Sequence, residues 1–190
     1  FLQQVMGWLP LAQSKDLLLI GGVGEVYRTF EQAKFRDFRE AGINRLSIGI
    51  QSFDAQQLTR LGRIHGRDEA LRAADIAHNA GFDNFNLDLM FALPQQTQEQ
   101  ALADLRTALS CNPTHLSWYQ LTIEPNTEFF SRPPVQPTDD AIADTQQAGI
   151  ELLASEGFQR YEISAFAKQG KRSRHNLNYW EFGDYLGIGA

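Results

Sequence analysis

Carboxamide and carboxylate side chains recur at every second position in residues 83–90. The polar set is Asn84, Asn86 and Asp88, and the apolar set between them is Phe85, Leu87 and Leu89. In a β-strand this period of two puts the two sets on opposite faces. Such polar groups can bind hydroxyl and amino groups, and they need hydrogen-bond partners when they are buried. The pattern predicts either a barrel strand whose polar face meets a bound polar cofactor or an antiparallel strand with one solvated face.

Strand-like and helix-like segments alternate along the chain. Strands are predicted at residues 15–20, 44–50, 82–90, 115–121 and 160–166, and helices at residues 30–40, 54–61, 67–79, 97–110 and 138–156. This order predicts a parallel sheet with helices packed against it. The strands expected to be parallel neighbours end at Ile50, Met90, Leu121 and Phe166. Asn86 and Asp88 should face inward, and residues 168–190 should form mostly loop.

A glycine-rich loop and the strand ends distinguish two parallel-sheet folds. A doubly wound nucleotide-binding sheet needs GxGxxG after its first strand and an acidic residue about 20 residues later. Residues 21–24 read Gly-Gly-Val-Gly, and no strand closes on an acidic residue at that spacing. A (β/α) barrel instead places its active residues at the C-terminal ends of several strands. Polar residues fall there at Gln51, Asp88, Glu124 and Ser164, so the pattern favours an α/β fold of the barrel type.

The composition limits the class of protein. The chain has 190 residues, a net charge of −6 and a single cysteine, Cys111. The acidic balance argues against a nucleic-acid-binding surface, which needs clustered Lys and Arg. The longest apolar run, residues 17–24, is shorter than the ~18 residues of a membrane span, although peripheral membrane association stays open. One cysteine fits a reducing cytoplasm, and the opening on Phe1 is expected of an internal fragment.

Six stretches, taken together, resemble one known family. They lie at residues 41–53, 61–65, 85–94, 115–127, 131–134 and 175–189, and they include the sequences Ile-Gly-Ile-Gln-Ser-Phe and His-Asn-Leu-Asn-Tyr-Trp. In order and spacing they resemble the oxygen-independent coproporphyrinogen III oxidase-like branch of the radical SAM superfamily, and within it the heme chaperones. The resemblance implies a partial (β/α) TIM-like barrel, incomplete at its N-terminal side, that holds S-adenosylmethionine against a 4Fe–4S cluster.

The resemblance also implies how the chain is divided. Residues 1–166 correspond to the C-terminal part of the radical SAM barrel core, and residues 167–190 to the start of the post-barrel heme-binding region. The family's CxxxCxxC loop, which ligates the cluster, would lie upstream of Phe1, so no metal ligand is assigned and the chain alone is expected to be inactive. Residues 17–29 depart from the family pattern, and the family's cofactor-contacting glutamate is not assigned to Glu25.

Three residues are implied to bind S-adenosylmethionine. The Gln51 amide can donate to and accept from ribose hydroxyls, or it can cap the adjacent turn. The Arg63 guanidinium can bind the methionyl carboxylate in bidentate fashion, or it is a solvated surface group. The Asp88 carboxylate can accept from ribose hydroxyls or the amino group, or it can pair with a polar group of a neighbouring strand. From the strand pattern, Gln120 is a further candidate for the lumen, and Trp118 and Tyr119 are expected in the core.

His175 is the residue that the resemblance implies for heme. An imidazole nitrogen is a good axial ligand for heme iron, and Tyr179 and Trp180 are large enough to line a porphyrin. The alternative is a structural histidine that packs this aromatic segment on the barrel. His65 and His115 are interpreted as mainly structural.

Three functions are compatible with these residues. The first is a heme-binding and heme-transfer chaperone on a radical SAM scaffold, with heme and heme-accepting proteins as partners. The second is an enzyme, an oxygen-independent coproporphyrinogen III oxidase that acts through a 5′-deoxyadenosyl radical. The third is an unrelated barrel enzyme, which is disfavoured because no phosphate-binding glycine loop follows the late strands. Residues 175–180 favour the chaperone, and the sequence leaves the oligomeric state open.

Overall fold

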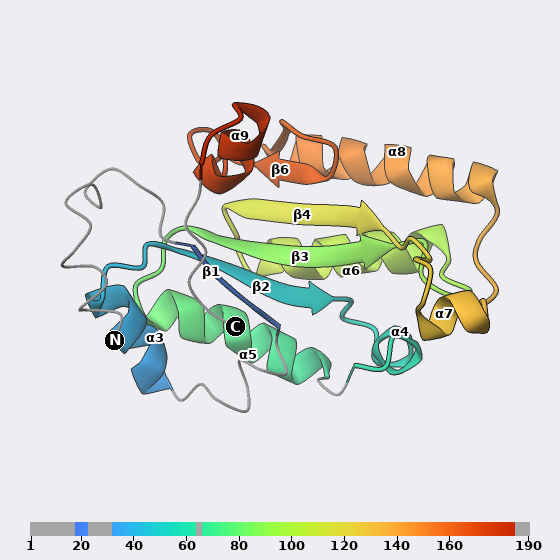
Figure 1. Ribbon diagram of the computed structural model, residues 1–190, viewed down its shortest axis with the longest axis horizontal. Helices are drawn as coiled ribbons and strands as arrows, with labels where there is room; N and C mark the ends of the chain where they lie inside the picture. Colours follow the sequence, from blue (N-terminus) through green and yellow to red (C-terminus); the bar gives the residue numbers. More distant parts are fainter. Residues whose placement is uncertain (1–17, 23–31, 64–65, 185–190) are drawn as a thin grey trace.

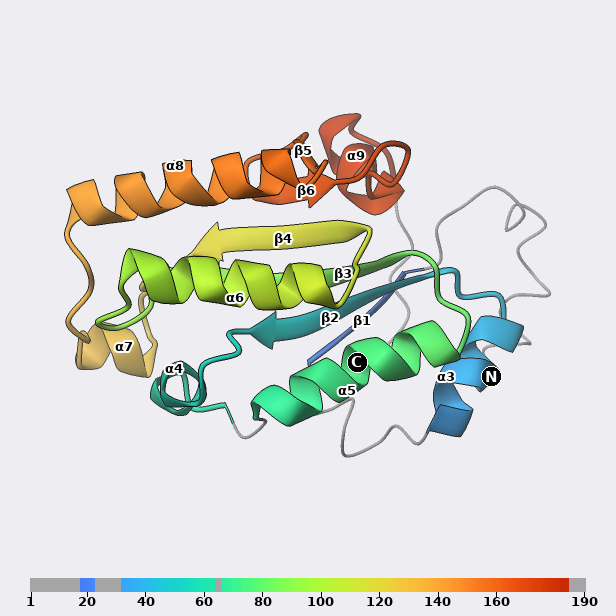
Figure 2. The same ribbon diagram turned by 180° about the vertical axis from the view of Figure 1, so that it is seen from behind.

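The computed structural model describes residues 18–22, 32–63 and 66–184. These residues build one sheet of six strands in the order β1-β2-β3-β4-β6-β5. Helices α5 and α6 lie behind the sheet in Figure 1 and cross in front of it in Figure 2, which is drawn from behind. Helix α9 lies over the other face, where β3 and β4 begin (Figure 1). The sheet therefore has one face covered by helices and one face that is partly open.

The elements largely follow the predicted order. The strands are β1 (Leu18–Gly22), β2 (Arg45–Gln51), β3 (Phe85–Phe91), β4 (His115–Gln120), β5 (Gln159–Arg160) and β6 (Ala165–Ala167). The helices are α3 (Gln32–Glu40), α4 (Ala55–Arg60), α5 (Arg67–Asn79), α6 (Gln98–Ser110), α7 (Glu128–Ser131), α8 (Asp139–Ser155) and α9 (Arg174–Trp180). Polar caps fix several helix starts, because a side-chain oxygen accepts from a backbone N–H that has no partner within the helix. Asp54 does this for α4, Thr97 for α6 and Thr138 for α8.

The first four strands are parallel, which confirms the prediction for β2, β3 and β4. Their register places Ser47 beside Asn86, and Asp88 beside Ser117. The apolar side chains of β3 are buried in the helix-covered core, namely Phe85, Leu87, Leu89 and Phe91. Asn86 and Asp88 point to the opposite face, as the alternation predicts. These features match the expected α/β fold with a parallel sheet.

The last predicted strand is wrong in direction. Residues 160–166 do not form one strand parallel to β4, because the chain turns back after β5 and β6 pairs antiparallel with β4. The reversal is held by the Arg160 guanidinium, whose Nη2 donates to the Ile163 carbonyl at 2.7 Å, and by the Tyr161 N–H, which donates to the Ala165 carbonyl at 3.1 Å. Since β5 is antiparallel to β6, it keeps the direction expected of a strand after α8. The return strand β6 lies between it and β4.

The segment after β6 is not mostly loop, which is a second correction. Residues 174–180 form α9, and the Ser173 hydroxyl caps it by accepting from the Asn176 N–H at 3.3 Å. The first strand also continues through Gly21 and Gly22, beyond its predicted end at residue 20. None of the helices in the described part of the chain is long and apolar enough to cross a membrane.

Candidate functional site

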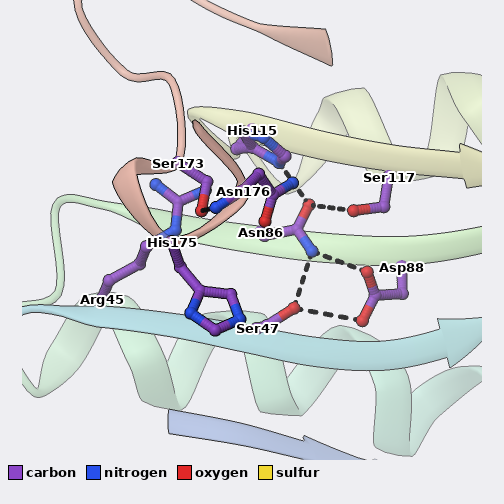
Figure 3. A pocket seen from close by; sticks show the side chains of 9 residues that line it. All are labelled: Arg45, Ser47, Asn86, Asp88, His115, Ser117, Ser173, His175 and Asn176. Atoms are coloured by element: carbon purple, nitrogen blue, oxygen red, sulfur yellow. Dashed lines mark hydrogen bonds between the residues drawn. The ribbon is translucent and has the colours of Figure 1, made fainter. Parts of the chain in front are cut away.

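A polar cavity of about 260 Å³ lies on the inner face of the sheet. Its walls are Arg45 and Ser47 from β2, Asn86 and Asp88 from β3, His115 and Ser117 from β4, and Ser173, His175 and Asn176 from α9 and its cap. Figure 3 shows these side chains gathered between the strands and α9. The same period of two that identifies the polar face of β3 recurs in β2 and β4. Parallel pairing then brings the three polar rows together.

Asp88 is held by its neighbours. Its Oδ1 accepts from Asn86 Nδ2 at 2.7 Å, and its Oδ2 accepts from the Ser47 hydroxyl at 3.1 Å. The pairing with a neighbouring strand that the sequence left open is therefore present, through Ser47. A carboxylate has about four lone-pair sites, so two accepted bonds leave capacity for a ligand. Asp88 lies in the middle of β3 rather than at its end, and it lines the cavity from there.

His115 has a defined place in this network, although the sequence gives it only a structural role. Its Nδ1 lies 2.7 Å from Asn86 Oδ1, and its Nε2 lies 2.6 Å from the Tyr161 hydroxyl. Burial, and secondarily the positive charge of Arg45, lowers the pKa of His115 to about 3. The ring is therefore neutral at physiological pH.

Gln51 occupies an unusual backbone conformation at the end of β2. Its φ of 65° lies in the left-handed region, which non-glycine residues seldom adopt, and the register with β3 shifts between Gly49 and Gln51. The side chain is buried, and the three polar candidates do not form one contact group. Gln51 ends β2 and Arg63 follows α4, whereas Asp88 lines the cavity.

A buried carboxylate holds the turn after Gln51. Asp104 of α6 accepts from the Ser52 hydroxyl at 2.6 Å and from the Phe53 N–H at 2.8 Å. Burial raises the pKa of Asp104 to about 6, although these two hydrogen bonds act in the opposite direction. This residue was not predicted, because nothing within residues 97–110 indicates which loop the helix will meet.

The charges of Asp88 and Arg63 both act on the pKa of the Tyr119 hydroxyl. Burial raises the pKa of the Tyr119 hydroxyl, the negative charge of Asp88 raises it further, and the positive charge of Arg63 lowers it. Strand alternation puts Tyr119 on the face of β4 that bears His115 and Ser117. The expectation is therefore wrong for Gln120, which is exposed on the alternate face, and for Tyr119, whereas Trp118 is buried in the core as expected. Arg63 itself is exposed just after α4.

His175 projects from α9 into the same cavity as Asp88 (Figure 3). Its ring meets the Tyr179 ring edge to face at a centroid distance of 5.0 Å. Large aromatic side chains are exposed on and just after α9, with exposed fractions of 49% for Tyr179, 59% for Trp180 and 96% for Phe182. Helix α9 thus presents an imidazole beside uncovered aromatic surface.

The remaining candidates are dispersed. Glu124 is exposed in the loop after β4, and Ser164 lies in the turn before β6. Glu25 and His65 lie outside the described residues. Within the described ranges, no three His, Cys, Asp or Glu side chains are grouped so that they could hold a metal ion, and Cys111 is the only cysteine of the whole chain.

Sequence comparison identifies relatives along the whole chain. The family model described as the radical SAM superfamily matches residues 23–116. The heme chaperone HemW of Escherichia coli K12 is 55% identical over 189 residues, which is 100% of this chain and 49% of that protein. HemW of Haemophilus influenzae is 55% identical over 162 residues, which is 85% of this chain and 42% of that protein. The chain therefore spans about half the length of the curated relatives it matches.

Structural comparison supports the fold. Coproporphyrinogen III oxidase (HemN) from Escherichia coli, a radical SAM enzyme, superposes with a TM-score of 0.76 at 23% sequence identity. The superposition covers 94% of this chain and 41% of that enzyme, and at this identity it speaks for the fold alone. The chain belongs to the radical SAM superfamily, in the branch that includes the heme chaperone HemW.

Proposed function

We propose that the protein binds heme and delivers it to heme-accepting proteins, on a scaffold that also binds S-adenosylmethionine. The observation that carries the proposal is α9, which offers the His175 imidazole beside three exposed aromatic side chains. The two HemW relatives support it, because each is named a heme chaperone and is 55% identical to this chain. The proposed location is the cytoplasm, and the proposed boundary between barrel and heme-binding region is residues 166/167.

The residues fit S-adenosylmethionine by chemical type. This ligand supplies ribose hydroxyls, an amino group and a carboxylate. Asp88 is an acceptor that lines the cavity and has unused capacity, and Gln51 offers both a donor and an acceptor. Arg63 offers a planar donor suited to a carboxylate. Tyr119, whose hydroxyl experiences the charges of both Asp88 and Arg63, is a fourth candidate.

A heme would lie on the surface of α9 rather than inside the cavity. At about 260 Å³ the cavity is below the roughly 300–1,000 Å³ typical of pockets for drug-sized ligands. The exposed rings of Tyr179, Trp180 and Phe182 offer apolar area for a porphyrin, and His175 offers an axial nitrogen. The exposed aromatic side chains on and just after α9 are the surface that such a ligand would cover.

The 4Fe–4S cluster does not fit the residues of this chain. A cluster takes three or four thiolates, and the chain has one cysteine, Cys111. We expect the chain alone to leave S-adenosylmethionine uncleaved after treatment with iron and sulfide. Cleavage under these conditions would contradict the inference that a chain with one cysteine cannot hold the cluster.

Two alanine variants of the complete protein test the assignment. Arg63→Ala should weaken S-adenosylmethionine binding by about 1.5–3 kcal/mol, through the loss of a charge-assisted contact, and should leave heme binding unchanged when heme is titrated alone. His175→Ala should do the reverse and alter the heme absorption spectrum. The matched controls are Arg106→Ala and His78→Ala, since Arg106 pairs with Glu99 on the surface of α6 and His78 binds the Cys111 carbonyl on the outer layer.

The outcomes separate the two candidate functions. If His175→Ala binds heme with an unchanged spectrum and affinity, His175 is a packing residue and the proposal loses its support in this chain. Conversion of coproporphyrinogen III, assayed on the same cluster-loaded preparation, would indicate the oxidase instead. Binding of heme without that conversion is the result that the proposal expects.

A further inference from the structure

A continuous chain of hydrogen bonds connects Asp88 with the start of α9. Asn86 Nδ2 donates to Asp88 at 2.7 Å, Asn86 Oδ1 lies 2.7 Å from His115 Nδ1, and His115 Nε2 lies 2.6 Å from the Tyr161 hydroxyl. The Tyr161 oxygen in turn lies 3.2 Å from the Ser173 N–H and 3.3 Å from Asn176 Nδ2. Figure 3 shows the part of this chain that lines the cavity. It joins β3 and β4 to the β5–β6 turn and α9.

The donors at the α9 end determine which group donates in each hydrogen bond of the series. A backbone N–H can only donate, and Asn176 Nδ2 also lies 3.4 Å from Glu162 Oε2, which supports its assignment as the amide nitrogen. The Tyr161 oxygen therefore accepts twice, and its own proton is directed to His115 Nε2. That nitrogen must be unprotonated, so the single proton of the neutral ring is on Nδ1 and is donated to Asn86 Oδ1.

The protons of Asn86 and Ser47 can be assigned in the same way. Because Asn86 Oδ1 is an acceptor, both protons of Asn86 Nδ2 are donated, one to Asp88 Oδ1 and one to the Ser47 oxygen at 2.7 Å. Ser47 then gives its own proton to Asp88 Oδ2. Every bond in the network points toward the Asp88 carboxylate. Each donor is matched to an acceptor, which is the condition under which a buried polar network rigidifies its members.

We propose that Tyr161, His115 and Asn86 are positioning residues that orient the Asp88 carboxylate for a ligand with hydroxyl or amino groups and tie it to the first turn of α9. Binding at Asp88 and binding at α9 are then coupled, because both select the state in which α9 is docked. The identity of the two ligands, S-adenosylmethionine and heme, rests on the proposed function. The direction of the hydrogen bonds does not.

Tyr161→Phe is the variant that tests this proposal. It keeps the ring, which meets His115 edge to face at 5.5 Å, and removes only the hydroxyl that links His115 to α9. The matched control is Thr145→Val, which removes a buried hydroxyl that bonds within α8, a helix that contributes no residue to the cavity walls. The complete protein is used throughout. Heme is titrated with and without saturating S-adenosylmethionine, and the imidazole of His115 is observed by ¹⁵N NMR.

In the wild type, His115 should show the Nδ1–H tautomer, and S-adenosylmethionine should raise heme affinity by about fivefold or more. In Tyr161→Phe the ¹⁵N shift of the unprotonated His115 Nε2 should change, because this nitrogen loses its hydrogen-bond donor, and the ratio of the two heme affinities should fall to about one, while Thr145→Val keeps both. An Nε2–H tautomer in the wild type, or an undiminished ratio in Tyr161→Phe, would overturn the proposal. If the wild type binds neither ligand, the proposed function fails, and the NMR signature alone decides on the hydrogen-bond chain.

Discussion

Replacing Asp104 by asparagine should change the way in which stability depends on pH. Asp104 is buried between α6 and the turn after β2, where it accepts from Ser52 and Phe53. Burial raises the pKa of this carboxyl to about 6, from the ordinary value of 3.8. In the folded protein the proton is therefore held more tightly than in the unfolded chain.

The sign follows from proton linkage. Between about pH 4 and pH 6 the folded state holds more protons at Asp104 than the unfolded state does, so the free energy of unfolding falls as pH rises through this window. Above pH 6 the folded protein carries the full cost of an ionised buried carboxylate. The difference between the two pKa values corresponds to about 2–3 kcal/mol.

Asparagine removes this dependence and keeps the shape. Its oxygen can accept from the Phe53 N–H, and its amide can donate to the Ser52 oxygen, so near pH 4, where Asp104 is protonated in the folded state, one neutral hydrogen-bonding group replaces another. Asp104→Asn should match the wild type in stability to within about 1 kcal/mol near pH 4 and should be the more stable protein near pH 7. Ser52→Ala should make the free energy of unfolding depend more steeply on pH. The hydrogen bond that it removes lowers the pKa of Asp104 in the wild type, so that pKa should be higher in the variant.

Urea unfolding at intervals from pH 4 to pH 8 measures the effect. The difference between Asp104→Asn and the wild type is the relevant quantity, since it cancels the other titrating groups. It should increase by about 2 kcal/mol across the range, in favour of the variant. A difference that stays flat, or that increasingly favours the wild type toward neutral pH, would refute the argument that burial dominates at this carboxyl.

Three further changes probe packing, capping and thiol reactivity. Gly149→Ala should lower the free energy of unfolding by about 1–3 kcal/mol, because an added Cβ would lie 2.0 Å from the Trp118 ring; urea unfolding with no loss would mean that α8 moves aside freely. Thr138→Ala should cost about 1 kcal/mol in the same assay, through the lost cap of α8, and an unchanged midpoint would show the cap to be dispensable. Burial raises the pKa of the Cys111 thiol, so a disulfide reagent at pH 8 should react more slowly with the folded than with the urea-unfolded protein, and equal rates would contradict this.

The parallel part of the sheet could be predicted because the sequence signals there are local. In β3 the alternation of polar and apolar residues decides which face is buried, and the helices on either side decide that the strands are parallel. The direction of β6 could not be predicted in the same way. Residues 160–166 are consistent with one strand, and only the contacts of the Arg160 side chain with backbone carbonyls show where the chain turns.

The candidate site was predicted in part for a related reason. Asp88 and His175 were found from their motifs, but their common cavity depends on α9 and on the hairpin beside β4. Asp104 was missed because its role is to satisfy a backbone N–H on another element, 51 residues away in sequence. A helix sequence contains no information about such a partner until the sheet has brought the two together.

His115 shows most clearly what a pattern leaves undecided. A single histidine at the start of a strand is usually structural. Nothing near His115 in sequence shows whether its ring only packs in the core or also orients another side chain. Its two partners, Asn86 and Tyr161, lie 29 and 46 residues away, and they come together only because β4 has β3 on one side and β6 on the other. Once they are together, counting protons fixes the tautomer of the ring and the direction of every bond. The register of β2, β3 and β4 therefore brings their polar side chains into one hydrogen-bonded network, which residue type alone does not predict.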